Sequence, residues 1–196
     1  MNIPANSRLI LASASPRRRE LLQALGLPFE VIVPHIEENN IKGESPRKTA
    51  LRLARAKALA VAEQIEEGLV LGVDTIVVID RDILGKPADE RSAKAMLTRL
   101  SGRTHAVISA MYLHRKPDGK FAQAAPTTKV TFNTLTPAQI DAYIATDEPL
   151  DKAGAYAIQG LGSVIVQSIV GCYFNVVGLS LPVLAQLLEE FGWEVL

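Results

Sequence analysis

The sequence predicts a mixed α/β fold in which helices flank a sheet that contains both parallel and antiparallel strands. Short apolar runs such as Leu9–Ala12 lead directly into amphipathic helical segments, which is typical of strand-helix units. Other apolar runs are joined by short polar turns, such as residues 116–120, which is typical of antiparallel hairpins. Because both kinds of connection occur along one chain, a strictly doubly wound sheet is not expected.

The N-terminal half alternates strands with capped helices. The apolar run Leu9–Ala12 predicts a strand, and Ser15 followed by Pro16 predicts the start of a helix that Gly26 ends. The same Ser-Pro pair recurs at 45–46. The elements expected in this half are the strand 9–12, the helix 16–25, the strand 29–33, the helix 46–67, the central strand 69–79 and its hairpin partner 83–84.

The C-terminal half combines hairpins with three further helices. Asp89 is a natural N-cap for a helix that stops at Ser101-Gly102, and Thr136-Pro137 begins another. Apolar runs on either side of Val170-Gly171 read as two strands. The elements expected here are the helix 90–100, the hairpin strands 105–114 and 124–132, the helix 136–145, the strands 164–169 and 173–177, and the helix 181–191.

The composition is that of an ordinary globular protein with a balanced charge. The 196 residues are 48% hydrophobic, enough for a single domain over 1–196. Lysine plus arginine equals aspartate plus glutamate at 21 each, so we expect no general affinity for a nucleic-acid polymer or a membrane. The one cysteine, Cys172, excludes an internal disulfide. Residues 1–8 lack the apolar core of a signal peptide, and no apolar run reaches the ~20 residues that span a bilayer, so we expect a cytoplasmic location.

The apolar stretch Leu69–Ile79 contains a single carboxylate, Asp74. A buried and unpaired carboxylate is costly because the ionised form loses its hydration. One interpretation is a turn, in which Gly72 and Asp74 separate two strands. The other is an acid held at a strand end, facing a metal ion or an attacking water. The stretch alone does not decide between them.

Three consecutive arginines occupy the first turn of the helix that begins after Ser15. Cations at this end of a helix oppose its macrodipole, and the free N–H groups there suit a phosphate. Successive helical residues diverge by about 100°, so the three cannot all face one ligand. We expect Arg17 and Arg18, rather than Arg19, to bind phosphate oxygens. The alternative is a solvated basic turn.

The remaining motifs narrow the chemistry. The chain has no Walker A loop, no dinucleotide-binding glycine motif, no G-x-S-x-G elbow and no H-E-x-x-H motif. The three histidines lack metal-ligand spacing, and Cys172 reads as a core residue. Glu37-Glu38 follows a strand, and such a pair either is solvated or supplies a metal ligand. Arginines for phosphate and carboxylates for a divalent cation are the parts that hydrolysis of a phosphoryl bond requires.

Several motifs along nearly the whole chain resemble the Maf family of nucleoside triphosphate pyrophosphatases, in family order and at similar spacing. The motifs are Leu11-Ala12-Ser13-Ala14-Ser15-Pro16-Arg17-Arg18, Gly72-Val73-Asp74-Thr75, Gly85-Lys86-Pro87, Leu100-Ser101-Gly102, Asp151-Lys152-Ala153-Gly154-Ala155-Tyr156 and Ile158-Gln159-Gly160. The resemblance implies a mixed, mostly antiparallel, curved sheet with flanking helices, in two lobes around a central cleft, as in inosine triphosphate pyrophosphatases. It also implies hydrolysis between the α and β phosphates, which yields a monophosphate and pyrophosphate.

The resemblance assigns roles to individual residues. Asp74 matches the catalytic acid that serves as general base for the attacking water. Arg17, Thr75 and Gln159 match three positions that go with dTTP and UTP in one branch of the family, whereas the branch that prefers 7-methyl-GTP has Trp, Gln and Glu there. Phosphate-binding positions are Ser13, Arg17, Arg18, Lys57 and Lys86, metal-binding positions are Glu38 and Asp74, and other cleft positions are Glu148, Asp151 and Lys152.

The residue types fit these implied roles. A Gln side chain offers both a donor and an acceptor, so Gln159 is chemically suited to the imide edge of thymine or uracil. A general base must lie within hydrogen-bond reach of the water, with cations on the developing charge, so Asp74 and the arginines are expected to face one crevice. Val73 stands where the family usually has Ala, and Ala157 where it usually has Gly.

The resemblance also implies a cofactor and partners. The expected cofactor is a divalent cation (Mg²⁺, Mn²⁺ or Co²⁺), the expected partners are the nucleoside triphosphate substrate and a second copy of the chain, and CTP or modified pyrimidine nucleotides are further candidate substrates. Because family members are linked to arrest of septum formation and cell division, the alternative function is a nucleotide-binding regulator with incidental hydrolysis. A binding module has no need of a general base, so Asp74 favours an enzyme.

Overall fold

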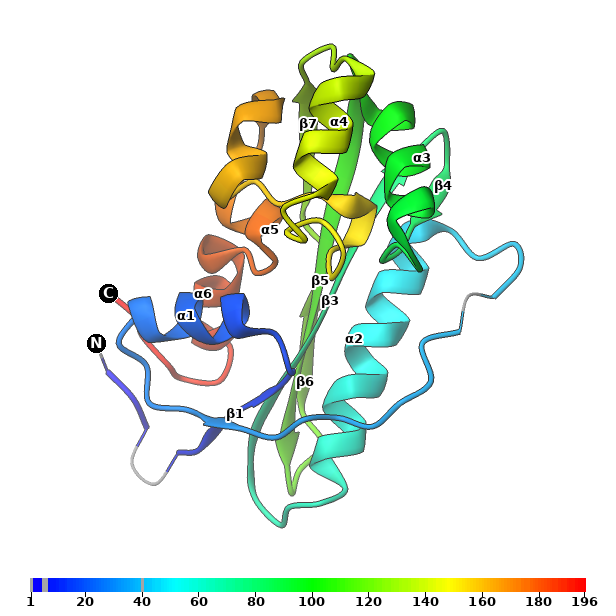
Figure 1. The fold of residues 1–196 in the computed structure, drawn as a ribbon. Helices are drawn as coiled ribbons and strands as arrows, with labels where there is room; N and C mark the ends of the chain where they lie inside the picture. Colours follow the sequence, from blue (N-terminus) through cyan, green and yellow to red (C-terminus); the bar gives the residue numbers. More distant parts are fainter. Residues whose placement is uncertain (1, 5–6, 40) are drawn as a thin grey trace. The chain divides into compact units, whose positions relative to one another are not determined.

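The structure is a computed structural model that describes residues 2–4, 7–39 and 41–196. Helices and strands alternate along the chain as the sequence predicts, and the fold is a mixed α/β one (Figure 1). The elements are β1 (Leu9–Ala12), α1 (Pro16–Ala24), β2 (Glu30–Val31), α2 (Pro46–Ala62), β3 (Gly68–Ile79), β4 (Asp82–Leu84), α3 (Glu90–Leu100), β5 (Thr104–Lys116), β6 (Phe121–Ala124), β7 (Thr127–Phe132), α4 (Pro137–Ile144), the 3₁₀ turns η1 (Ala153–Ala155) and η2 (Gly160–Ile165), β8 (Val166–Val170), α5 (Tyr173–Val177) and α6 (Leu181–Glu189).

The strands form a mostly antiparallel sheet in the order β2-β1-β3-β5-β7-β8, with β4 beside β3 and β6 beside β5. Strand β1 pairs in parallel with β2 and with β3, whereas β3–β4, β5–β6, β5–β7 and β7–β8 are antiparallel. The chain divides into two compact units. The first contains 1–74, 109–126 and 178–196, and the second contains 75–108 and 127–177.

The first unit is built on β1 and the beginning of β3. All four residues of Leu9–Ala12 are buried, and α2 buries a face of small residues together with Leu53 and Val61. This face explains the apolar periodicity of the segment, because residues three and four apart lie on one side of a helix. The parallel register places Ala12 opposite Gly72. The residues that follow β1 therefore lie beside the part of β3 that leads to Asp74.

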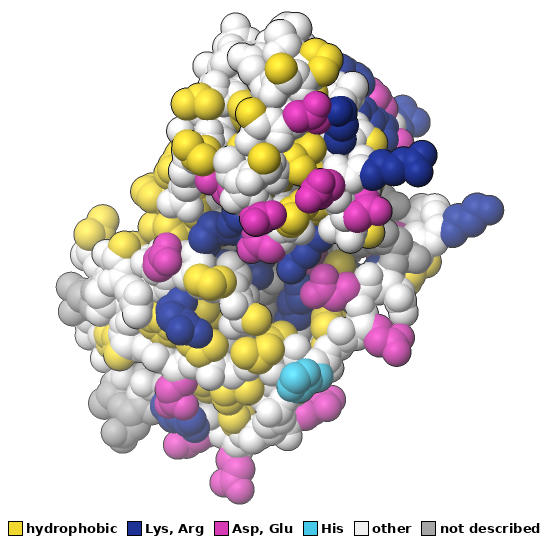
Figure 2. Space-filling model, viewed as in Figure 1, with side chains coloured by type: hydrophobic (Ala, Val, Ile, Leu, Met, Phe, Trp, Pro, Cys, Tyr) yellow, Lys and Arg dark blue, Asp and Glu magenta, His cyan; other side chains and the backbone are white. Residues whose placement is uncertain are grey.

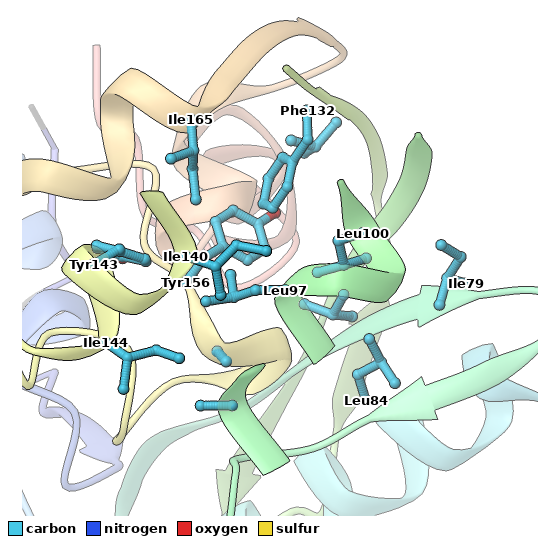
Figure 3. Close-up of a cluster of buried hydrophobic side chains, with 14 of the residues drawn as sticks. Ile79, Leu84, Leu97, Leu100, Phe132, Ile140, Tyr143, Ile144, Tyr156 and Ile165 are labelled. Atoms are coloured by element: carbon cyan, nitrogen blue, oxygen red, sulfur yellow. The ribbon is translucent and has the colours of Figure 1, made fainter. Parts of the chain in front are cut away.

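The second unit has its own apolar core. Helices α3 and α4 pack over it, and Leu97, Leu100, Phe132 and Tyr156 meet in its centre (Figure 3). Full burial of a side chain of this size contributes roughly 1.5–3 kcal/mol. Helix α3 begins with the predicted cap, since the Asp89 carboxylate accepts from the Ser92 N–H at 2.7 Å.

Several predicted elements were wrong in extent or type. Helix α2 ends at Ala62 rather than 67, because the intervening residues carry the chain back to Gly68, where β3 begins with φ +138°. The predicted strand 124–132 is two strands, β6 and β7, since a proline at 126 cannot donate to a strand ladder. Residues 173–177 form helix α5, not a strand. In addition, β2 is limited to two residues, and Ser15 makes no side-chain cap bond.

Candidate functional site

Asp74 lies in the interior of β3, so it is neither in a turn nor at a strand end. Both sequence interpretations of its location were therefore wrong. Its side chain is buried, and the residue is 5% exposed. The Lys57 ammonium donates to Asp74 Oδ1 at 2.6 Å. This ion pair explains how the carboxylate is tolerated inside an apolar strand, because a buried charge needs a hydrogen-bonded partner of opposite charge.

Lys57 binds a second carboxylate. Its Nζ lies 2.8 Å from Glu38 Oε1, so one ammonium group joins Asp74 to the loop that follows β2. Lys57 is 8% exposed, whereas Glu38 is exposed. Within the described part of the chain, Asp74 Oδ2 is buried and has no hydrogen-bond partner. Among the described residues, the carboxylate is thus held through one oxygen, and its other oxygen accepts no hydrogen bond.

Gly72 explains why Lys57 reaches β3. A Cβ at residue 72 would lie 2.1 Å from the Ala54 carbonyl oxygen and 2.9 Å from the Ala58 Cβ. Both contacts belong to α2, on either side of Lys57. The helix backbone therefore rests directly on the strand at this point, which only a glycine permits. The spacing between Gly72 and Asp74 in β3 then sets the acid beside the lysine.

Ser13 and Arg18 form a second part of the same unit. Ser13 Oγ accepts from Arg18 Nη1 at 3.1 Å and from the Ser15 N–H at 3.2 Å, and Arg18 Nε donates to the Gly178 carbonyl at 3.1 Å. Desolvation lowers the pKa of Arg18, while the Asp74 and Glu38 charges act to raise it. The guanidinium therefore lies within electrostatic range of both carboxylates.

The three arginines of the first helix differ in exposure. Arg17 and Arg18 are half-buried, and Arg19 is exposed. Arg17 also lies near enough to Arg18 to act on its pKa, in the lowering direction. The divergence of successive helical residues thus separates Arg19 from the other two, and the alternative of a fully solvated basic turn does not describe Arg18.

In the second unit, Glu148 lies at the centre of a hydrogen-bond network. Its Oε1 accepts from the Tyr143 hydroxyl at 2.8 Å and from the Gly162 N–H at 2.9 Å, and its Oε2 accepts from the Leu161 N–H at 3.0 Å. Burial acts to raise the pKa of Glu148, but these three hydrogen bonds and the Lys152 charge together outweigh it, so the net shift of the pKa is downward. Glu148 is therefore ionised at neutral pH.

The other candidates of this unit lie around that network. Lys152 Nζ donates to the Glu148 carbonyl at 2.6 Å and to Asp151 Oδ1 at 2.5 Å. The Gly154 N–H donates to the Gly85 carbonyl at 3.0 Å, which brings the segment with Lys86 beside the segment with Lys152. Lys86, Asp151 and Gln159 are exposed, and Thr75 is half-buried.

The structure therefore sorts the candidate residues into two sets, one in each unit. The first set is Ser13, Arg17, Arg18, Glu38, Lys57 and Asp74, and the second is Thr75, Lys86, Glu148, Asp151, Lys152 and Gln159. The sequence analysis missed Tyr143, whose hydroxyl contacts both Glu148 and the Ala157 N–H. No motif marks this residue, because a buried tyrosine on a short amphipathic helix is indistinguishable in sequence from an ordinary core residue.

A metal ion has two candidate ligands in the first set. No group of three or more His, Cys, Asp or Glu side chains with metal-binding geometry occurs in residues 2–4, 7–39 and 41–196. Glu38 and Asp74 do converge on one cationic group, the Lys57 ammonium, and no described residue donates a hydrogen bond to the buried Asp74 Oδ2. Hard divalent cations prefer such oxygen ligands, so these two carboxylates are chemically suited to one.

The surface carries charges of both signs. On the face shown in Figure 2, lysine and arginine side chains are interspersed with aspartate and glutamate rather than gathered in one broad patch. Among the helices that the structure describes, none combines the length and the apolar character needed to cross a bilayer.

Comparisons with known proteins agree on one family. The family model described as Maf-like protein matches residues 8–191. A protein of Syntrophomonas wolfei named dTTP/UTP pyrophosphatase is 48% identical over 186 residues, which cover 95% of this chain and 98% of that protein. A protein of Moorella thermoacetica with the same name is 51% identical over 189 residues, which cover 96% of this chain and 97% of that protein.

Among solved structures, the Staphylococcus aureus Ham1 protein superposes with a TM-score of 0.47 at 14% identity, over 64% of this chain and 72% of that one. The sequence relatives carry the assignment, since they are about half identical and extend over nearly all of both chains. The chain belongs to the Maf family.

Proposed function

We propose that this protein is a nucleoside triphosphate pyrophosphatase that hydrolyses dTTP and UTP to the monophosphate and pyrophosphate. The observation that carries the proposal is the environment of the buried Asp74 carboxylate. Lys57 binds its Oδ1, and no described residue donates a hydrogen bond to its Oδ2. The names of the S. wolfei and M. thermoacetica relatives support the substrates.

Asp74 serves as the general base in this proposal. Its Oδ2 accepts a proton from water as the water oxygen attacks the α-phosphorus, and the bond from that phosphorus to the oxygen bridging to the β-phosphorus breaks. The electron pair of this bond leaves on pyrophosphate. Lys57 orients the carboxylate, because the ammonium binds the other oxygen and offsets the cost of burial.

Arg17, Arg18 and Ser13 bind the phosphates. Arg18 is anchored through Nε and Nη1 to Gly178 and Ser13, so its charge is held in place before substrate arrives. Preorganised donors of this kind cost little reorganisation when charge develops in the transition state. Lys86 and Lys152 are further cations for the phosphate chain in this proposal. Asp151 fixes the Lys152 ammonium rather than contacting substrate.

Gln159, Thr75 and Arg17 determine the choice of base. The Gln159 amide pairs with the imide edge of uracil or thymine, and its exposed position leaves it accessible to a ligand. This role comes from the resemblance, and the residue types match those of the dTTP and UTP branch at all three positions.

A divalent cation is the proposed cofactor. Asp74 and Glu38 would hold it together with phosphate oxygens, and it would neutralise the charge that develops on the leaving pyrophosphate. We expect excess chelator to abolish pyrophosphate release and added Mg²⁺, Mn²⁺ or Co²⁺ to restore it. Release that persists at the original rate in excess chelator would remove the cation from the proposal.

The test of function is an assay of pyrophosphate release with dTTP, UTP, CTP and 7-methyl-GTP. We expect dTTP and UTP to be the preferred substrates. Asp74→Asn should lower kcat by at least about 10²-fold while the fold is retained, because the amide can still accept from Lys57 but cannot take the proton of water. Circular dichroism and thermal unfolding check the fold of the variant.

The matched control is Asp118→Asn. This exposed carboxylate lies between β5 and β6 and pairs with Arg115, so its loss should leave kcat unchanged. Near wild-type turnover by Asp74→Asn would deprive Asp74 of the role of base. Absence of turnover by the wild-type protein, with nucleotide binding retained, would favour the alternative of a nucleotide-binding regulator. A single domain over 1–196, a central cleft, a homodimer and a cytoplasmic location remain predictions.

A further inference from the structure

Glu148 uses both carboxylate oxygens on the protein itself. It accepts the Tyr143 hydroxyl and the N–H groups of Leu161 and Gly162, at 2.8, 3.0 and 2.9 Å. Hydrogen bonds to an ionised acceptor are roughly twice as strong as neutral ones. They fix the backbone immediately after Gln159, the residue that reads the base in the proposed function.

The same network fixes the backbone before Gln159. The Tyr143 hydroxyl accepts from the Ala157 N–H at 3.1 Å while it donates to Glu148. Tyr143 itself is buried at 6% exposure in the core of the second unit (Figure 3). One anchored phenol therefore bonds to the chain on one side of Gln159 and, through Glu148, on the other.

Two glycines allow the chain to close on this pair of side chains. Gly160 has φ +65°, and a Cβ there would lie 2.5 Å from Glu148 Oε2. A Cβ on Gly162 would lie 2.2 Å from the Ala157 carbonyl oxygen and 2.5 Å from the Tyr143 hydroxyl. Neither position has room for a larger residue. The segment 157–162 is thus wrapped tightly around the carboxylate and the phenol.

We propose that Glu148 is a positioning residue for Gln159, which together with Tyr143 clamps the segment 157–162 and so presents the Gln159 amide to the imide edge of a pyrimidine nucleotide. The inference rests on the proposed function, because it takes Gln159 as the reader of the base. The role proposed for Glu148 differs from that of Glu38 and Asp74, the two carboxylates proposed to bind the metal ion. In this proposal the Glu148 carboxylate contacts neither the substrate nor the metal ion and acts through the segment that it holds.

A double-mutant cycle on kcat/KM for UTP tests this coupling. Because Glu148→Ala removes the acceptor of three hydrogen bonds, we expect it to lower kcat/KM by about tenfold, mainly through a higher KM. Gln159→Ala should have a similar effect. The double variant should be no worse than Gln159→Ala alone, since the clamp then has nothing to position. Losses that multiply in the double variant would show that Glu148 acts independently, and would overturn the proposal.

Two further variants grade the effect. Glu148→Gln keeps an oxygen for Tyr143 and Gly162 but turns an amide toward the Leu161 N–H, so its loss should lie between those of the wild type and Glu148→Ala. Tyr143→Phe removes both hydroxyl contacts and should likewise have no effect in the Gln159→Ala background. If Glu148→Ala does not fold, the double-mutant cycle is measured with Glu148→Gln and Tyr143→Phe instead.

Asp141→Asn is the matched control. Asp141 lies on α4, the helix that carries Tyr143, but it is exposed and pairs with Lys94 at 2.5 Å. We expect kcat/KM for UTP to stay at the wild-type value. A loss as large as that of Glu148→Ala would mean that any change to α4 has this effect, which would overturn the proposal.

Amide hydrogen exchange separates this proposal from the proposed function, because it needs no turnover. The Leu161 and Gly162 amides should exchange at least about tenfold faster in Glu148→Ala than in Asp141→Asn. If the wild type does not hydrolyse UTP but exchange is still faster in Glu148→Ala, the result would support the clamp and overturn only the proposed function. Unchanged exchange at these amides would overturn the clamp.

Discussion

Lys57 is the residue on which the proposed catalytic centre depends most directly. Its ammonium is buried and binds one carboxylate inside the protein and another at the surface. A buried carboxylate that loses its partner retains the whole cost of desolvation. The stability and the chemistry of the site therefore depend on the same ion pair.

We expect Lys57→Met to lower the free energy of unfolding at pH 7 by about 3 kcal/mol, because the buried Asp74 carboxyl group loses the ammonium that binds it. Urea unfolding monitored by circular dichroism measures this loss. The double variant Lys57→Met/Asp74→Leu should recover most of it. Lys94→Met, which removes the exposed partner of Asp141, should cost less than about 1 kcal/mol. Equal losses in Lys57→Met and Lys94→Met would contradict the role given to burial.

At the scale of single residues, the sequence indicates which groups matter but not which groups meet. The cost of Asp74 in an apolar run is apparent from the sequence, and its partner is not. Lys57 lies 17 residues earlier on a different element, and their contact depends on how closely α2 approaches β3. Glu148 was assigned to the cleft by resemblance, whereas two of its hydrogen bonds come from a turn 13 and 14 residues later and the third from Tyr143 on α4.

At the scale of elements, the approach of α2 to β3 decides the geometry of the centre. A methyl group at residue 72 would overlap the Ala54 carbonyl, which belongs to the helix backbone and cannot rotate away. We expect Gly72→Ala to lower the free energy of unfolding by at least about 2 kcal/mol. It should also lower kcat, because a displaced α2 carries Lys57 away from Asp74.

The matched control for this substitution is Gly85→Ala. A Cβ at residue 85 has nothing within 4 Å, and its φ lies outside the left-handed region. This variant should change the free energy of unfolding by less than about 1 kcal/mol, as judged by urea unfolding. If Gly72→Ala were as stable and as active as Gly85→Ala, the helix would have to approach the strand less closely than the structure has it.

Elements with local signals were predicted well, and an element set by distant contacts was not. The start of α3 follows from Asp89 and Ser92, two residues three positions apart that make the capping hydrogen bonds with each other. Helix α5 has β-branched and aromatic residues that favour a strand. In the fold, the buried Asn175 amide donates to the Val107 carbonyl at 3.0 Å and to Thr128 Oγ1 at 3.1 Å. These partners lie on β5 and β7, and no local pattern reveals them.

At the scale of the whole molecule, the sequence predicted the class of fold because that class depends on connections between neighbouring elements. Short polar turns make antiparallel neighbours, and β1, which passes directly into α1, makes parallel ones. The split of the predicted strand 124–132 also has a signal in the sequence, the proline at 126. The proline alone does not show that the strand divides, because the division also depends on β5 being long enough to pair with β6 and β7 in succession.

The stability of the whole molecule should also depend on pH through His105. This histidine is buried, its Nε2 lies 2.8 Å from the Tyr156 hydroxyl, and its ring meets Phe132 edge to face at 4.9 Å. Desolvation lowers the pKa of His105 from 6.5 to about 4. Between these two values the unfolded chain binds a proton that the folded protein does not, so folding stability falls as the pH decreases.

We expect His105 alone to lower the free energy of unfolding by about 3 kcal/mol as the pH falls from 7 to 4. Below pH 4 this residue should cause no further loss. Carboxylates also titrate in acid, so the measurement is a comparison. Urea unfolding of the wild type and of His105→Gln, which keeps a polar partner for Tyr156, is followed from pH 4 to about pH 8. The free energy of unfolding should fall less steeply in the variant, and the two slopes should agree above pH 7. Parallel curves from pH 4 to 7 would mean that His105 is protonated as readily in the folded protein as in the unfolded chain.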